Sequence, residues 1–373
     1  MLHACVSMPS QARGMAPTFW SSMASMNESA AKSPEANQPG ASADRFSSIR
    51  RGILWCVLFL LAALAVLHWT QPDLLAPITM VPTWFWMGLM FCSALLCLRK
   101  DTKRFAIITL GVTLLFGFLF ADEVWSLTRF RSLASAEQLR TQDKLIRVVT
   151  LNCNIGRVSA ANEVKPLNPD IVLLQESPGP ESLATQADEL FGEHGQVISS
   201  GDTSILLAGR IISKFEDRSS HYCLATAELT DGTIITVACV RLSPPVYRLD
   251  FWNQRFWSKH KESRIDHRQQ LQQVRGKIAS NPNAANVIIG GDFNSVARDG
   301  AFDALPDSLS DAFRISGVGW GGTGANDYPI FRVDQIWGSD SLQPQAVVSQ
   351  KTKHSDHRMV VADLFIGENA GQR

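Results

Sequence analysis

Three long apolar runs dominate the first third of the chain, at residues 53–69, 78–98 and 105–121. Each holds about 17 to 21 residues with almost no charge, and a helix needs about 20 apolar residues to cross a bilayer. Trp69, Trp84 and Trp86 lie near the ends of these runs, where membrane helices concentrate their aromatic residues. A buried helical hairpin in a soluble domain is the alternative, and three consecutive runs fit it poorly. The pattern therefore predicts a membrane domain over residues 45–122 with three transmembrane helices.

The placement of Lys and Arg predicts how these helices are oriented. Basic residues precede the first run, at 45–51, and fill the second connection, at 99–104, whereas the first connection has no Lys or Arg. The third run is followed at once by Asp122 and Glu123. Because cytoplasmic loops carry the excess of Lys and Arg, we expect a multi-pass protein of the cell (inner) membrane with everything after residue 121 on the extracytoplasmic side. If one run did not span, that side would invert.

The segments around the membrane domain are polar. Residues 1–44 are rich in Met, Ser, Ala, Pro and Asn without apolar periodicity, which is typical of a disordered tail. They lack the pattern of a signal peptide, and Met15, Met23 or Met26 could equally be the first residue. Residues 123–144 are interpreted as a juxtamembrane linker and residues 367–373 as a C-terminal tail.

A globular domain is predicted over residues 145–366. Short β-rich runs dominate it, at 146–151, 171–174, 204–207, 234–240, 287–289, 345–348 and 359–365. Two stretches, 181–191 and 263–279, have a helical pattern. Clusters of strands with few helices between them favour a layered α/β domain with a sheet-on-sheet core.

The charge and the cysteine content of this domain argue against some classes of protein and of site. From Leu145 onward there are 22 Lys and Arg against 26 Asp and Glu. A protein built mainly to hold a nucleic-acid backbone normally has a basic surface instead. The seven Cys have no CxxC spacing, so neither a disulfide framework nor a zinc site is indicated.

Polar side chains gather at the ends of the predicted strands. A Gly-Gly turn delivers Asp292 and Asn294, which lie two residues apart and so point to the same side. The other groups are Asn152 with Asn154, Gln175-Glu176, Arg332-Val333-Asp334 and His354-Ser355-Asp356-His357. Each has an ordinary alternative as a turn, a helix cap or a core histidine. Together they are an inventory for phosphoryl chemistry, because carboxylate and amide oxygens suit Mg²⁺ and a histidine held by an acid can transfer protons.

In this order the motifs resemble the endonuclease/exonuclease/phosphatase superfamily, over nearly all of residues 145–366. The resemblance implies a four-layered α/β sandwich, two packed β-sheets flanked by helices, here preceded by the three transmembrane helices of a membrane-anchored, bacterial-type member. It also implies hydrolysis of phosphodiesters or phosphomonoesters, usually with Mg²⁺, with Mn²⁺ as the second candidate.

The resemblance also implies roles for individual residues. Glu176 would be the principal metal-binding carboxylate, with Asn152 and Asp356 beside the metal. Asp292 would orient or deprotonate the attacking water, and Asn294 would hold the scissile phosphate. His357 would act on the phosphate as a general acid/base or by stabilising charge, with Asp334 fixing its tautomer.

Arg241 departs from the family pattern. Many members have a histidine in a run like Asn-Thr-His-Leu before a proline, and here Arg241-Leu242-Ser243-Pro244 takes that place. Arginine cannot deprotonate in proteins, so it cannot serve there as an acid or base. It can still grip a phosphate with two hydrogen bonds. We therefore expect Asn152, Asn294 and Arg241 to contact the substrate phosphate.

The function expected is that of a membrane-anchored, Mg²⁺-dependent phosphodiesterase that hydrolyses a P–O bond by metal-assisted attack of water. An extracytoplasmic endonuclease or exonuclease is one alternative, less favoured because the domain is slightly acidic. A catalytically attenuated phosphate-binding membrane protein is the other, on account of Arg241. The sequence does not indicate the substrate or an oligomeric state.

Two further stretches are open to more than one interpretation. Aromatic and basic residues alternate over residues 247–277. This stretch could bind bases, phosphorylated headgroups or a membrane surface, or its aromatic side chains could pack inward. The Gly-rich run Gly317–Gly324 is interpreted as a loop over the site.

Overall fold

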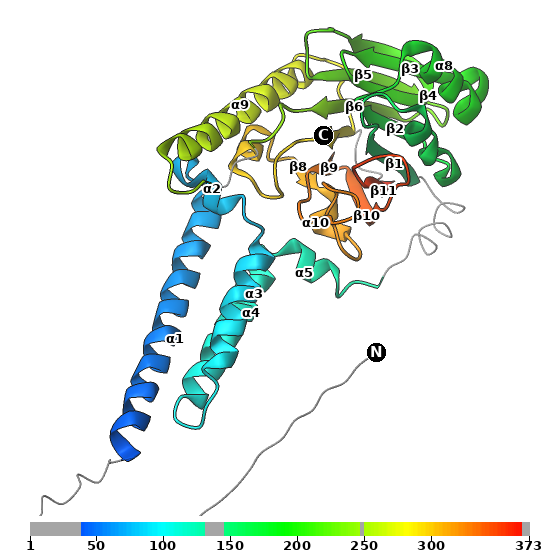
Figure 1. The fold of residues 1–373 in the computed structure, drawn as a ribbon. Coiled ribbons are helices and arrows are strands. Elements are labelled where there is room, and N and C mark those ends of the chain that lie inside the picture. Colours follow the sequence, from blue (N-terminus) through cyan, green and yellow to red (C-terminus); the bar gives the residue numbers. More distant parts are fainter. Residues whose placement is uncertain (1–38, 131–144, 247–249, 368–373) are drawn as a thin grey trace, which may run out of the picture. The chain divides into compact units, whose positions relative to one another are not determined.

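The computed structural model describes residues 39–130, 145–246 and 250–367, with side chains from residue 44 on (Figure 1). The chain divides into a unit of residues 1–46 and a unit of residues 47–373, and every described strand belongs to the second unit. The tails predicted at 1–44 and 367–373 and the linker predicted at 123–144 lie largely outside the described residues.

The helices at the start of the chain are α1 (Pro39–Thr70), η1 (Asp73–Leu75), α2 (Ala76–Thr79), α3 (Thr83–Leu96), α4 (Lys103–Phe120) and α5 (Asp122–Ser126). In the described chain, two helices are long and apolar enough to cross a membrane, Asp44–Thr70 and Lys103–Phe120. The predicted run 78–98 is broken, and the segments Asp73–Thr79 and Thr83–Leu96 meet at a bend of 62°. Pro82 lies at this break and disfavours helical geometry in the residue before it. The middle run is a third span only if the bent pair is counted as one.

The apolar helices pack against each other along narrow stripes. Leu61 and Leu64 of α1 are buried in one cluster with Met90 of α3 and Phe116 of α4. Only 28% of each spanning window is buried within the protein, and Phe59 is 78% exposed. A helix that is apolar all round but packed on one stripe is typical of a membrane segment.

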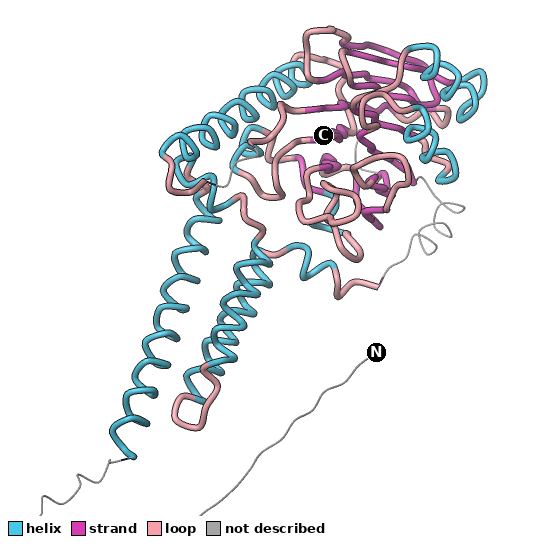
Figure 2. The backbone as a smooth tube through the Cα atoms, in the orientation of Figure 1, coloured by secondary structure: helices cyan, strands magenta, loops and turns pink. Residues whose placement is uncertain are grey.

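Eleven strands are found among the described residues of the α/β region: β1 (Leu145–Asn152), β2 (Ile171–Gln175), β3 (Gly195–Ser200), β4 (Thr203–Phe215), β5 (Tyr222–Leu229), β6 (Ile234–Arg241), β7 (Val287–Asp292), β8 (Leu309–Asp311), β9 (Asp334–Ser339), β10 (Leu342–Gln350) and β11 (Met359–Ile366). They run in the order β10-β11-β1-β2-β4-β5-β6-β7-β9-β8, and β3 pairs with β4. The long strand β4 pairs with β2 through residues 203–207 and with β5 through residues 209–215. It therefore joins two sheets into one curled path (Figure 2).

The main core lies between these two sheets. Val148 and Leu173 of one sheet share a buried cluster with Ala225, Val237 and Ile288 of the other. Alternate residues of the same strands point outward and meet helices, so each sheet is buried on both faces. On one side lie α7 (Val158–Ala161) and α8 (Pro180–Phe191), and on the other lies α9 (Gln254–Ala279). This is the mixed α/β fold with a sheet-on-sheet core that the sequence predicts.

Some details differ from the prediction. Strands β3, β5, β8 and β9 are absent from the predicted set. Helix α9 begins at Gln254 rather than at residue 263, because Asn253 caps it by accepting a hydrogen bond from the Arg255 backbone N–H. The aromatic side chains of this stretch divide, since Phe256 is 1% exposed and Trp252 is 88% exposed.

Arginines of the α/β region bind the segments at one end of the apolar helices. Asp122, directly after α4, accepts hydrogen bonds from Arg298 at 2.6 Å and from Arg332 at 3.3 Å. Arg264 of α9 donates to the Thr79 hydroxyl at 2.6 Å, and Arg268 donates to Asp73 at 2.7 Å. The apolar helices are therefore bonded to the α/β region at several points.

Candidate functional site

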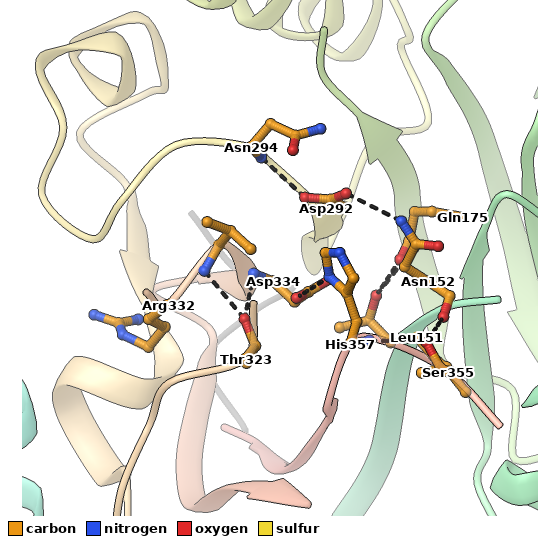
Figure 3. Close-up of polar contacts among 12 residues, drawn as sticks. Leu151, Asn152, Gln175, Asp292, Asn294, Thr323, Arg332, Asp334, Ser355 and His357 are labelled. Carbon is orange, nitrogen blue, oxygen red and sulfur yellow. Dashed lines mark hydrogen bonds and ion pairs between the residues drawn. The ribbon is translucent and has the colours of Figure 1, made fainter. Parts of the chain in front are cut away.

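Strand ends bring the predicted site residues to one edge of the fold (Figure 3). Arg241 at the end of β6 lies opposite Asp292 at the end of β7, and Asp292 lies opposite Asp334 at the start of β9. Across the core, β1 ends at Asn152, and His357 stands just before β11. Residues opposite each other on neighbouring strands project to the same face, so the register places Arg241, Asp292 and Asp334 in one row.

The two glycines predicted to form a turn lie within β7 instead, where they pair with β6 and β9. Gly291 has φ +146°, and a Cβ there would collide with the Val240 carbonyl of β6. Two residues after Asp292, Asn294 has φ 47°, and its N–H donates to the Asp292 carboxylate at 3.0 Å. Asp292 therefore makes an ordinary Asx turn and also faces the site. The turn interpretation and the functional interpretation of this motif do not exclude each other.

Asn152 links the two sheets. Its amide nitrogen donates to Asp292 at 3.1 Å and to Glu176 at 3.3 Å, and the side chain is nearly fully buried. Its backbone carbonyl accepts a 2.6 Å hydrogen bond from the Ser355 hydroxyl, which in turn accepts one from the His357 N–H at 3.0 Å. Ser355 thus ties β1 to the histidine loop, a role that the motif alone did not reveal.

His357 and Asp334 form a hydrogen-bonded pair. Nδ1 of the ring donates to the Asp334 carboxylate at 2.8 Å. The backbone N–H of Asp334 is itself held by the Thr323 hydroxyl at 3.0 Å. Burial alone would lower the pKa of His357, but the charge and hydrogen bond of Asp334 outweigh it and raise that pKa to about 10. Near neutral pH the ring is therefore an imidazolium whose tautomeric and rotational freedom is removed.

For Asp292, burial is the largest cause of the pKa shift, and it raises the pKa. Its burial, followed by repulsion from Asp334, raises its pKa to about 7, although the charge of His357 opposes this. A carboxyl group that titrates near neutral pH can accept a proton from water under physiological conditions.

A group able to hold a metal lies at the centre of this edge. Ligand atoms of Asp292, Asp334 and His357 all lie within 4.8 Å of one another. One carboxylate oxygen of Asp334, Oδ1, is buried and accepts no hydrogen bond from any residue of the described chain. Since buried carboxylate oxygens are normally satisfied, this oxygen is suited to a cation. The carboxylates of Asp292 and Asp334 fit a hard divalent ion, whereas the ring of His357 can ligate a metal only after it loses a proton.

Glu176 lies at the same edge but is already paired with a cation. The residue has φ 44°, which aims its carboxylate at the Ile155 N–H (2.7 Å) and at the Arg241 guanidinium (2.8 Å). Its burial would raise its pKa, but these partners outweigh burial, and the pKa is lowered. Arg241 is also bound to Asp202. The acid Asp202, which follows a glycine in the turn between β3 and β4, had no sequence signal.

The predicted metal set of Glu176, Asn152 and Asp356 differs from the group that the structure brings together. The side chain of Asp356 is exposed, and it is the backbone carbonyl of this residue that accepts a hydrogen bond, from the Asn326 N–H. Asn152 presents its amide nitrogen, a donor, to both Glu176 and Asp292. The set therefore stays a prediction, beside Asp292, Asp334 and His357 as a second candidate.

Comparisons with known proteins assign the family. The model of the Endonuclease/Exonuclease/phosphatase family matches residues 149–357, and the chain belongs to this family. It is accordingly a hydrolase acting on phosphate ester bonds, in a family whose enzymes typically depend on a divalent metal. No curated protein matches the chain.

Solved structures include several similar folds. A mannosyl-6-phosphatase of Bacteroides thetaiotaomicron is 15% identical, with 59% of this chain and 100% of that chain covered and a TM-score of 0.47. A truncated Caenorhabditis elegans TDP2 is 20% identical, with 59% and 97% covered and a TM-score of 0.43. A family protein of Bacteroides vulgatus is 15% identical, with 60% and 100% covered and a TM-score of 0.47.

Proposed function

We propose that this protein is a membrane-anchored phosphodiesterase that hydrolyses a P–O bond by attack of water with the help of Mg²⁺, or of Mn²⁺ in its place. The observation that carries the proposal is the group of buried Asp292, buried Asp334 and partly buried His357, whose polar atoms lie within 4.8 Å of one another. It combines a carboxyl that titrates near neutral pH with an imidazolium, the pair of functions that water attack on a phosphate requires.

Each residue has a role that follows from its chemistry. Asp292 orients the water and takes its proton as the water oxygen bonds to phosphorus. The His357 imidazolium, held by Asp334, stabilises the charge on the phosphate oxygens and can protonate the departing oxygen. Family resemblance assigns Asn294 and Asn152 to the phosphate. The amide nitrogen of Asn152 donates to Glu176 and Asp292 in this structure, so it would have to exchange one of these partners for the phosphate. When bound, a divalent ion supplies positive charge beside the phosphate.

Two sets of residues could hold that ion. Family resemblance supports Glu176, Asn152 and Asp356. Proximity and the free Asp334 oxygen support the carboxylates of Asp292 and Asp334, with His357 as a third ligand only if its ring is neutral. In either arrangement Asn152 lies between the two carboxylates. Metal-binding measurements on single variants of Asp292 and Glu176 separate the two sets.

Arg241 is compatible with the proposed enzyme and also with a protein that binds phosphate without turnover. Its guanidinium stands in the row with Asp292 and can hold a phosphate with its remaining donors. Its pairing with Glu176 and Asp202 favours a second candidate function, an attenuated protein that binds a phosphate ligand without turnover. The intact Asp292, Asn294, Asp334 and His357 favour the enzyme.

The proposal also includes the side of the membrane on which the site lies, and it has one alternative activity. The basic residues before α1 and between α3 and α4 support a site on the extracytoplasmic side of the cell (inner) membrane. An extracytoplasmic nuclease is the alternative activity, disfavoured by the slightly acidic α/β region.

The full chain in detergent, assayed on bis(4-nitrophenyl) phosphate with and without Mg²⁺, tests the proposed activity. We expect Mg²⁺-dependent release of nitrophenol that Asp292→Ala and His357→Ala each abolish. A rate that neither variant changes would contradict the proposal. Tight binding of inorganic phosphate without any turnover would favour the attenuated protein instead.

A further inference from the structure

The candidate site lies beside the ends of the apolar helices. Residues between 76 and 83, at the connection of α1 to α3, line part of two hollows. One hollow is also lined by Asn294 and Pro245. The other is also lined by Ile330, Phe331 and Arg332, which precede Asp334 by a few residues. Segments from the membrane end and residues from the site edge thus share both hollows.

One loop connects the helix ends to the catalytic histidine. Trp320 packs edge-on against Trp84 at the start of α3, with ring centroids 5.4 Å apart. Its ring N–H donates to the Pro329 carbonyl at 2.6 Å. Further along the loop, Gly324 forms backbone bridges with both Phe331 and His357. The loop over residues 317–331 therefore contacts the membrane helices at one end and the site at the other.

This loop exposes large apolar side chains next to the site. Tyr328 is 79% exposed, Ile330 46% and Phe331 41%. They stand almost consecutively in the chain, beside helix ends whose aromatic residues are also exposed, such as Phe85 at 48%. Exposed apolar residues gathered in one place mark a contact surface, and a site of this kind continuous with membrane helices is suited to lipid.

The site edge is fixed to the helix ends by buried charges. Arg332 is 2% exposed and bonds Asp311 at 2.6 Å as well as Asp122 at 3.3 Å. Arg264 is 3% exposed and bonds Asp299 at 2.9 Å as well as the Thr79 hydroxyl. Breaking a buried pair is strongly destabilising, because the charge that remains is buried without a partner. These contacts therefore fix the site edge at the ends of the apolar helices.

From these contacts we infer that the substrate is the phosphodiester headgroup of an amphiphile that stays in the bilayer, entering beside residues 328–331. The inference rests on the proposed phosphodiesterase activity and names its substrate class. An apolar chain left in the membrane would place the phosphate at the site edge without leaving the lipid. Binding energy from such a remote, unreactive part of a substrate can be used to position its reacting phosphate.

Two probes with the same reacting centre test this inference. Ethyl 4-nitrophenyl phosphate is soluble, and hexadecyl 4-nitrophenyl phosphate inserts into phosphatidylcholine. With the full chain in phosphatidylcholine nanodiscs and Mg²⁺ present, we expect kcat/KM for the hexadecyl ester to exceed that for the ethyl ester at least about tenfold. Equal rates on the two esters would overturn the inference and leave the proposed activity standing. Loss of both rates would overturn both.

Substitutions in the loop over residues 317–331 test whether its exposed side chains cause the preference for the hexadecyl ester. Tyr328→Ser and Phe331→Ser should lower the rate on the hexadecyl ester at least about fivefold and change the rate on the ethyl ester less than about twofold. Ile234→Ser is the matched control, because Ile234 is also 41% exposed but stands at the start of β6, and it should change neither rate. Unchanged hexadecyl hydrolysis in both loop variants would overturn the inference, as would faster cleavage of a DNA oligonucleotide than of the hexadecyl ester.

Discussion

Nδ1 of His357 lies 2.8 Å from the carboxylate of Asp334, whose side chain is 0% exposed, and the acid holds the ring in its charged form. A histidine that remains an imidazolium across the physiological range cannot take a proton from water there. In the proposed mechanism its function at this edge is therefore electrostatic, or that of an acid. The proposed proton acceptor is Asp292, whose pKa burial and Asp334 raise to about 7.

The pH dependence of hydrolysis should report both groups. Activity should rise with pH as Asp292 deprotonates near 7 and fall as His357 deprotonates near 10. In Asp334→Asn the falling limb should move down by at least about one pH unit, because the neutral amide no longer stabilises the imidazolium. The measurement is kcat/KM against pH on bis(4-nitrophenyl) phosphate.

Asp327→Asn is the control for this shift, since Asp327 is a 71% exposed acid in the neighbouring loop, paired with Lys351. An unmoved falling limb in Asp334→Asn would contradict the assignment of that limb to His357.

The pair of His357 and Asp334 also affects the stability of the fold. A pKa raised from 6.5 to about 10 in the native state gives stability that is fully present below pH 6.5 and lost as the pH rises through 10. Asp334→Asn should remove this dependence of thermal stability on pH.

Most of the site could be predicted because its residues follow recognisable strands. Asn152, Glu176 and Asp292 each end a run of apolar β-forming residues, and such runs carry a strong sequence signal. The fold class follows from the same runs. The bend before α3 was missed because run length and hydropathy outweighed Pro82, which interrupts the helix there.

The contacts that tune the site could not be predicted, because they join distant residues with no local pattern. Asp202 binds Arg241 from 39 positions away, and Ser355 bonds Asn152 across 203 positions. Thr323 holds the Asp334 N–H from a glycine-rich loop. A lone hydroxyl or acid in a turn is common and indicates nothing by itself. Only the folded register assigns these partners.

Metal binding should depend on Asp292 more than on Glu176. The Glu176 carboxylate is already satisfied by Arg241 and the Ile155 N–H, whereas Asp334 keeps a free buried oxygen beside Asp292. Mn²⁺ binding to the chelator-treated full chain at about pH 8, above the pKa of Asp292, is measured by calorimetry. It should weaken at least about tenfold in Asp292→Asn and less than about threefold in Glu176→Gln. The reverse order would assign the ion to the set that family resemblance implies.

Removing the charge of Arg241 should weaken substrate binding. A hydrogen bond to a charged group contributes about 1.5–3 kcal/mol, so KM for bis(4-nitrophenyl) phosphate should rise about tenfold or more in Arg241→Gln, with a smaller effect on kcat. Arg210→Gln is the matched control, because Arg210 pairs with Glu228 but is 72% exposed. An Arg241→Gln variant with higher turnover than the native chain would instead indicate that Arg241 attenuates the enzyme.

The backbone of the Gly-Asp-Phe-Asn turn offers a test that needs no substrate. In Gly291→Ala the new Cβ would collide with the Val240 carbonyl, and φ there is +146°. Strained backbone alone costs about 1–3 kcal/mol, so strain and collision together should destabilise the fold by about 3 kcal/mol or more. Gly232→Ala separates the two effects. Gly232 has φ +83°, but a Cβ there meets no heavy atom of the described chain within 4 Å, and it should cost about 1 kcal/mol. Equal losses of thermal stability in both variants would show that close packing of β7 on β6 is not what requires glycine at position 291.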